Sequence, residues 1–138
     1  MIAPNPAQQR IVITGIGLTA PGANHLVEFR ENLLEGRSGI SPWKVPYIGE
    51  TFGGVCDFDQ GRYQTRKEVR RGTRAGSIAV YCAARAVDDA GLDWENIEKS
   101  RIGVYVGVTE HGNVETEAEI EHLHGNANDP SYWPTQSK

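Results

Sequence analysis

Residues 10–17 of this 138-residue chain read RIVITGIG, and they decide the fold class that the remaining segments must fit. The first half of this stretch is a β-branched run, which predicts a buried strand, and its glycines predict a turn where the strand ends. A second apolar run, RIGVYVGV, occupies residues 101–108. Because this run is apolar on both faces, it predicts a strand of a parallel sheet that is covered on both sides.

Helical patterns lie between and after these two runs. Apolar side chains recur at helical spacing from Leu26 to Leu34, with Asn24 as the expected N-cap and Gly36 after the last turn, which predicts a helix over residues 25–35. Three further helices are expected over residues 65–71, over the alanine-rich residues 77–90, which Gly91 ends, and over the acidic residues 114–124. This order of strands and helices predicts an α/β protein. Two strands are too few to complete a sheet, so we expect the chain to form part of a larger body.

The remaining segments lack periodicity. Residues 1–9 read as a loose leader, ahead of a domain over residues 10–138. Residues 37–62 are interrupted by prolines and glycines and form a long connection, with a short strand expected at residues 54–56. No apolar run approaches the roughly 20 residues of a membrane span, and the N-terminus lacks the pattern of a signal peptide, so a cytoplasmic location is expected.

Charge is distributed unevenly along the chain. The formal net charge is −4, which argues against nucleic acid as a partner. Residues 62–74 nevertheless hold six basic side chains and one acid, whereas residues 110–124 hold five acids and no lysine or arginine. The basic stretch is either a solvated helix face or a docking surface for an acidic partner.

The glycines after the first expected strand suggest a nucleotide site. Residues 15–20 read GIGLTA, which matches the G-x-G-x-x-A form of the dinucleotide-binding fingerprint. In that motif a helix begins at the glycines and its N-terminus holds the pyrophosphate. Here Pro21 and Gly22 delay the helix, and the acid roughly 20 residues on, Glu35, lies at a helix end. A pair of turn glycines is therefore the favoured interpretation.

Neither a metal site nor a nucleophile stands out from the residues. His122 and His124 are two positions apart on an expected helix, so they point to different sides, which is poor geometry for chelation even with His111 nearby. Cys82 lies within an apolar helix, where a cysteine is usually inert. Neither Cys82 nor Cys56 has a histidine close in sequence that could activate its thiol. Two cysteines are too few for a disulfide framework, and they fit a reducing compartment.

Several stretches that are unspecific alone occur in a characteristic order. RIVITGIG is followed by NLLEGRSGI at residues 32–40, FGGV at residues 52–55, RKE at residues 66–68, DAGL at residues 89–92 and RIGVYVG at residues 101–107. In this order they resemble the N-terminal part of the β-ketoacyl synthases, which condense acyl groups on carrier proteins. The resemblance covers residues 10–112 with little need for gaps.

The resemblance implies a thiolase-like fold, in which two similar αβα halves stack in five layers, αβαβα, usually in a homodimer. Residues 10–138 would then be an incomplete N-terminal ketosynthase domain within the first αβα half. Family members hold the acyl group on a cysteine and use two histidines and an oxyanion hole, and these residues lie beyond residue 138 by position. The complete synthase would join an acyl thioester to a malonyl-carrier thioester by decarboxylative Claisen condensation. This chain would contain no catalytic residue, bind no cofactor or metal, and be inactive alone.

Two sites carry over by position from the resemblance. Lys67, Arg70 and Arg71 match the basic helix with which similar synthases engage the acidic acyl carrier protein. A turn of the acyl pocket corresponds to Thr109, Glu110, His111 and Gly112. Because an unpaired buried carboxylate is costly, Glu110 is expected to face solvent or to signal a short, polar or aromatic substrate.

Three alternatives stay open from the sequence. The first is a non-catalytic partner subunit like a chain-length factor, which would form a heterodimer with a related subunit in fatty-acid or polyketide biosynthesis. The second is the dinucleotide-binding oxidoreductase domain. The third is a carrier-protein adaptor that acts alone through the basic helix, although its sheet edges and apolar helix faces would be exposed to water.

Overall fold

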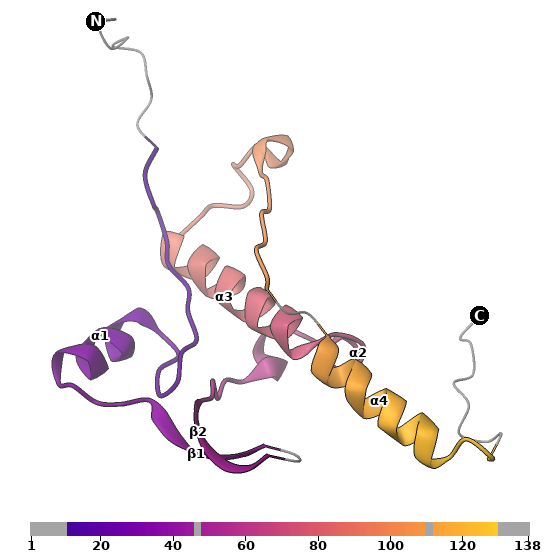
Figure 1. The fold of residues 1–138 in the computed structure, drawn as a ribbon. Helices are drawn as coiled ribbons and strands as arrows, with labels where there is room; N and C mark the ends of the chain where they lie inside the picture. Colours follow the sequence, from indigo (N-terminus) through magenta and orange to yellow (C-terminus); the bar gives the residue numbers. More distant parts are fainter. Residues whose placement is uncertain (1–10, 46–47, 110–111, 130–138) are drawn as a thin grey trace, which may run out of the picture.

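The computed structural model describes residues 11–45, 48–109 and 112–129, and the expected leader at residues 1–9 lies outside these ranges. The elements follow the order α1 (Leu26–Leu34), β1 (Ile40–Val45), β2 (Gly49–Gly54), α2 (Arg66–Arg71), α3 (Arg74–Ala90) and α4 (Asn113–Gly125). Two short 3₁₀ helices, η1 (Gln60–Arg62) and η2 (Lys99–Arg101), precede α2 and α4. The long helix α3 lies at the centre of the described chain (Figure 1).

All four expected helices are confirmed, with small changes at their ends. α3 begins at Arg74 because the Thr73 hydroxyl caps it, accepting the Gly76 N–H at 3.1 Å. The expected N-cap of α1 was wrong by one residue, since His25 Nδ1 accepts the Glu28 N–H at 3.3 Å. The side-chain amide of Asn24 instead donates to the carbonyl of Asp57 at 2.6 Å, which ties the start of α1 to the chain after β2.

Both expected strands are wrong for the described residues. Residues 11–14 and 102–108 run as elongated chain, and in the part that the structure describes only β1 and β2 pair in a sheet (Figure 1). Ile11 is 101% exposed and Tyr105 is 98% exposed. A strand requires a neighbour whose N–H and C=O groups pair with its own, and the described chain offers these two apolar runs no such neighbour.

The pairing of β1 with β2 was not anticipated beyond the short strand expected at residues 54–56. The pair is antiparallel, with Ile40 opposite Gly54 and Val45 opposite Gly49, so β2 ends where the expected strand would begin. Proline and glycine conceal the strand pattern in this sequence. A two-stranded ribbon tolerates Pro42 because each of its strands has an unpaired edge.

Gly15 and Gly17 do not form the expected turn, because the chain passes directly over α3 at these positions. A Cβ atom on Gly17 would lie 1.9 Å from the carbonyl oxygen of Cys82, and one on Gly15 would lie 2.1 Å from that of Ala86. Only glycine permits such a close approach of two backbones. The turn falls later, at Gly22, which has a φ of 79°.

A tyrosine on α3 forms the centre of a small aromatic cluster. Tyr81 is 7% exposed, and its ring centroid lies 5.1 Å from that of Phe58 and 5.8 Å from that of Tyr63. The Tyr63 hydroxyl also donates to the Asp88 carboxylate at 2.7 Å. These contacts attach η1 and the residues before α2 to the side of α3, and they set the position of α2.

Candidate docking surface

A capping box stabilises α2, the short helix that holds most of the basic stretch. The Thr65 hydroxyl accepts the Glu68 N–H at 3.3 Å, and the Glu68 carboxylate accepts the Thr65 N–H at 2.7 Å. The Thr65 hydroxyl also donates to the Glu68 carboxylate at 2.8 Å, and the hydrogen bonds that this carboxylate accepts from the backbone N–H and the hydroxyl of Thr65 lower the pKa of Glu68. The single acid of the basic stretch is thereby used in the fold of the helix.

Two of the six basic side chains also serve the fold. Arg62 donates to the Tyr63 hydroxyl at 3.1 Å, which raises the pKa of Arg62, and its guanidinium lies 5.4 Å from the centroid of that ring. Arg74 donates through its guanidinium to the carbonyl of Cys56 and lies 5.6 Å from the centroid of the Phe58 ring. Both arginines therefore anchor the segment between β2 and α3.

The other four basic side chains lie on α2 and are exposed: Arg66, Lys67, Arg70 and Arg71. Within the described ranges, none of the four has a hydrogen bond or an ion pair. At about 100° per residue, their positions span an arc of about 140° on the helix. We call these four residues the basic face of α2. The structure thus brings the predicted docking residues onto one surface and adds Arg66 to them.

The turn predicted for the acyl pocket is described at its two ends only. Thr109 is exposed, Gly112 adopts a φ of 80°, and Glu110 and His111 lie outside the described residues. A Cβ atom on Gly112 would lie 3.3 Å from the Thr73 methyl group, so this turn meets the N-terminus of α3 just after α2. The two predicted sites therefore approach each other, although they are some forty positions apart in the sequence.

A contact that the sequence did not indicate fixes this arrangement. The Glu115 carboxylate, near the start of α4, accepts the backbone N–H of Arg74 at 2.7 Å. A carboxylate at a helix N-terminus is favourable because it meets unpaired N–H groups and the positive end of the helix dipole. The signal was weak in the sequence, since acids at alternate positions of a helix read as a solvated surface.

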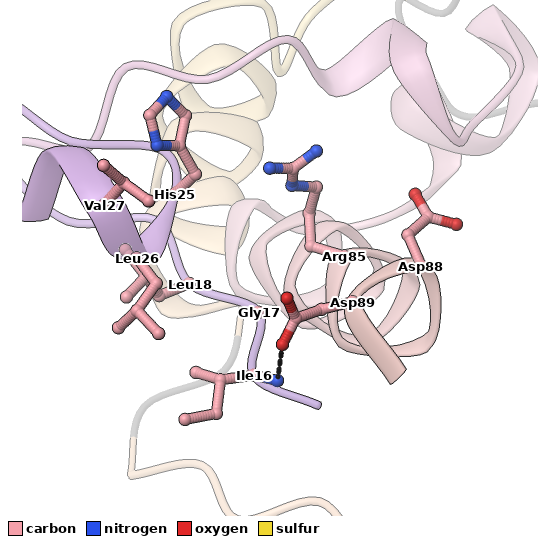
Figure 2. A pocket seen from close by; sticks show the side chains of 9 residues that line it. All are labelled: Ile16, Gly17, Leu18, His25, Leu26, Val27, Arg85, Asp88 and Asp89. Carbon is pink, nitrogen blue, oxygen red and sulfur yellow. Dashed lines mark hydrogen bonds between the residues drawn. The ribbon is translucent and has the colours of Figure 1, made fainter. Parts of the chain in front are cut away.

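A cavity of about 380 Å³ lies where residues 16–18 meet the start of α1 and the end of α3, and Figure 2 shows the side chains that line it. Most of the polar side chains in its wall form hydrogen bonds that stabilise the fold. His25 caps α1, Asp88 accepts from Tyr63, and Asp89 accepts the Ile16 N–H at 2.9 Å. The arrangement presents no nucleophile and base within reach of each other, so we assign it no chemistry.

The remaining candidates do not assemble into a site. Cys56 and Cys82 are free and half-buried, and Cys56 donates its thiol to the Thr19 carbonyl at 3.6 Å. Among the described residues, no group of three or more histidines, cysteines or acids is placed to hold a metal ion. In the same ranges, no helix has both the length and the apolar character that a membrane crossing requires.

The fold is therefore α/β, with a basic helix presented beside a glycine turn. The family described as β-ketoacyl synthase, N-terminal domain, matches residues 8–137. The chain belongs to the β-ketoacyl synthase family and corresponds to its N-terminal domain. This confirms the resemblance that the sequence motifs indicated. The close packing of Gly15 and Gly17 on the backbone of α3 argues against the dinucleotide-binding alternative, in which these glycines would face a pyrophosphate.

Relatives include a 3-oxoacyl-[acyl-carrier-protein] synthase and a polyketide β-ketoacyl synthase. The chain is 36% identical over 107 residues to 3-oxoacyl-[acyl-carrier-protein] synthase 2 of Synechocystis sp., which covers 75% of this chain and 26% of that protein. It is 38% identical over 103 residues to the granaticin polyketide putative β-ketoacyl synthase 1 of Streptomyces violaceoruber, with coverages of 72% and 24%. The chain thus spans about a quarter of the length of these relatives.

A solved structure shows the same fold. The chain superimposes on the ishigamide ketosynthase/chain length factor with a TM-score of 0.65 and 28% sequence identity. The match covers 88% of this chain and 31% of that chain.

Proposed function

We propose that this chain is the N-terminal portion of a β-ketoacyl synthase of fatty-acid or polyketide-type biosynthesis. The observation that carries the proposal is the family match over residues 8–137. In this proposal, residues 10–138 form an incomplete ketosynthase domain within the first αβα half of a five-layer αβαβα protein. The assembly is a homodimer, or a heterodimer with a related subunit, in the cytoplasm.

The proposed reaction joins two thioesters. A cysteine thiolate attacks the acyl thioester and releases the carrier thiol, so that the acyl group is held on the enzyme. Loss of CO₂ from the malonyl-carrier thioester leaves an enolate, which attacks the acyl-enzyme carbonyl and expels the cysteine. The product is a 3-oxoacyl-carrier thioester. None of these roles falls to Cys56 or Cys82 in the proposal, so the chain contributes to binding and not to bond formation.

The basic face of α2 supplies the binding role. Lys67, Arg70 and Arg71 are exposed, project from a helix fixed by its capping box, and lack partners among the described residues. Unpaired positive charges on a rigid element attract an acidic partner and guide its approach. We therefore assign these three residues to docking of the acyl carrier protein.

The turn at residues 109–112 supplies the second role, as one wall of the acyl pocket. Gly112 lies against the N-terminus of α3, directly after the basic face, which supports a short path from the docked carrier to the pocket. Thr109, Glu110 and His111 would then help to select the acyl group.

A condensation assay tests the proposal. The protein, purified in its native assembly, is incubated with an acyl-carrier and a malonyl-carrier thioester, and the intact mass of the carrier is followed with time. We expect the mass of a 3-oxoacyl-carrier and release of one CO₂ for each product. Unchanged carrier masses in an assembly that binds the carrier would contradict a synthase.

A second candidate is a non-catalytic subunit like a chain-length factor. The observation that favours it is the similarity to a solved ketosynthase/chain length factor. In the same assay this candidate predicts no product from the protein alone and product when a related ketosynthase subunit is added.

A further inference from the structure

A groove runs along one flank of the basic face. It has a volume of about 280 Å³ and is lined by Gln60, Gly61, Arg66, Val69 and Arg70. Gly61 contributes backbone without a side chain, and Val69 is the apolar group of the groove. Ligand pockets for small molecules usually exceed about 300 Å³, so a groove of this size is suited to a single side chain.

The position of Val69 relative to the charges is specific. On an ideal helix, Val69 lies about 60° from Arg66 and about 100° from Arg70, whereas Glu68 lies on the opposite flank of the basic face. An element that docks on the basic face therefore meets charge along its centre and a groove that contains Val69 on one flank. The hollow on the other flank is lined by Thr65, Lys67, Glu68, Arg71 and Gly72, without an aliphatic side chain of this kind. Because the two flanks differ, the two orientations in which an element could dock on the basic face are not equivalent.

Both walls of the groove are held in place before any partner binds. On the η1 side, the Asp59 carboxylate accepts the Gly61 N–H at 2.9 Å. On the α2 side, the capping box of Thr65 and Glu68 holds the first turn of the helix. A preformed groove costs little ordering entropy when a side chain enters it.

We propose that this groove receives an apolar side chain from the acidic surface of the carrier protein, and that Arg66 is a fourth docking residue beside it. The inference rests on the proposed function, since it identifies the partner as a carrier. Charge complementarity supports this occupant, because Arg66 and Arg70 line the groove and have no partners among the described residues. Carboxylates of the partner pair with the basic face while its apolar side chain contacts Val69.

The test measures binding of a fluorescently labelled carrier protein to the native assembly over a range of salt concentrations. Val69→Thr keeps the volume of the side chain but adds a hydroxyl, and Arg66→Ala removes one charge. Val27→Thr and Arg30→Ala on α1 are the matched controls, since both native residues are exposed and lie on another helix. Circular dichroism establishes that each variant is folded.

We expect Val69→Thr to weaken binding about fivefold with an unchanged salt dependence, because an apolar contact is insensitive to salt. Arg66→Ala should weaken binding about threefold and make the salt dependence shallower. The two controls should bind as the native protein does. Since Arg66 is exposed, its variant stays informative even where Val69→Thr disturbs α2.

Other outcomes separate the inference from the proposed function. Native affinity in both Val69→Thr and Arg66→Ala, together with a loss of binding in Arg70→Ala, would overturn the inference and leave carrier docking intact. Native affinity in Arg70→Ala and Lys67→Ala as well would overturn the docking function itself. A change in sedimentation with no change in carrier binding would identify a second copy of the chain as the occupant, which also contradicts the inference.

Discussion

At the scale of single residues, the close approach of Gly17 to α3 makes the sharpest prediction. Gly17→Ala places a Cβ where the Cys82 carbonyl already lies, so the two backbones must separate. Overpacking of this kind costs about 1–3 kcal/mol, measured as the free energy of unfolding in urea. Gly107→Ala is the matched control, because a Cβ at Gly107 meets nothing within 4 Å among the described residues. Equal stability of the two variants would contradict the packing of residues 15–17 on α3.

The capping box of α2 makes a second residue-scale prediction, on pH. The folded pKa of Glu68 lies below its ordinary value of 4.5, so the box stabilises α2 fully above that pH and loses its effect as the pH falls through the lower folded value. Thr65→Ala keeps the backbone N–H that donates to Glu68 but removes the hydroxyl that also donates to it, so the pKa of Glu68 should move part of the way back toward 4.5. A carboxyl NMR titration measures both values. An unshifted Glu68 in the native protein would disprove the box.

At the scale of elements, the helices could be predicted and the strands could not, for a physical reason. The signals for α1, α2 and α3 are local: apolar spacing, a capping threonine, and glycines after the last turn. A strand depends on a neighbour that is distant in the sequence. The apolar runs at residues 11–14 and 102–108 therefore predict segments that can pair in a sheet, but they do not identify the strands with which these segments pair. The β1–β2 ribbon was missed because Pro42 and three glycines conceal it. The basic stretch was found from charge, and the resemblance then predicted docking for Lys67, Arg70 and Arg71. Arg66 needed the structure, which shows that Arg62 and Arg74 are already engaged.

Hydrogen exchange tests this view of the two apolar runs. In the isolated chain, the amides of residues 102–108 should exchange as fast as unstructured peptide, whereas Ile16, whose N–H is bonded to Asp89, should exchange measurably more slowly. In a native synthase assembly, the same run should become protected, since a neighbouring strand would pair with it. Fast exchange in both samples would contradict a ketosynthase sheet built on these residues.

At the scale of the whole molecule, positive and negative side chains are concentrated on different helices. Its net charge is −4, yet the basic face of α2 is positive and the helix α4 carries four glutamates. We expect Lys67→Glu with Arg70→Glu to weaken carrier binding at least tenfold at low salt, because like charges then face each other. Arg30→Glu on α1 changes the net charge in the same direction and should leave binding nearly unchanged. A loss of affinity in that control as large as in the double variant would mean that net charge, and not a docking face, governs the interaction.

The proposal that this chain serves docking and does not hold the nucleophile is tested most directly by locating the acyl group during catalysis. The native assembly is incubated with an acyl-carrier thioester alone, digested, and searched by mass spectrometry for an acylated cysteine. We expect one acylated cysteine, in a peptide that does not belong to residues 1–138. An acyl group on Cys56 or Cys82 would contradict the proposal, because this chain would then contain the nucleophile and would not be a docking portion of a synthase.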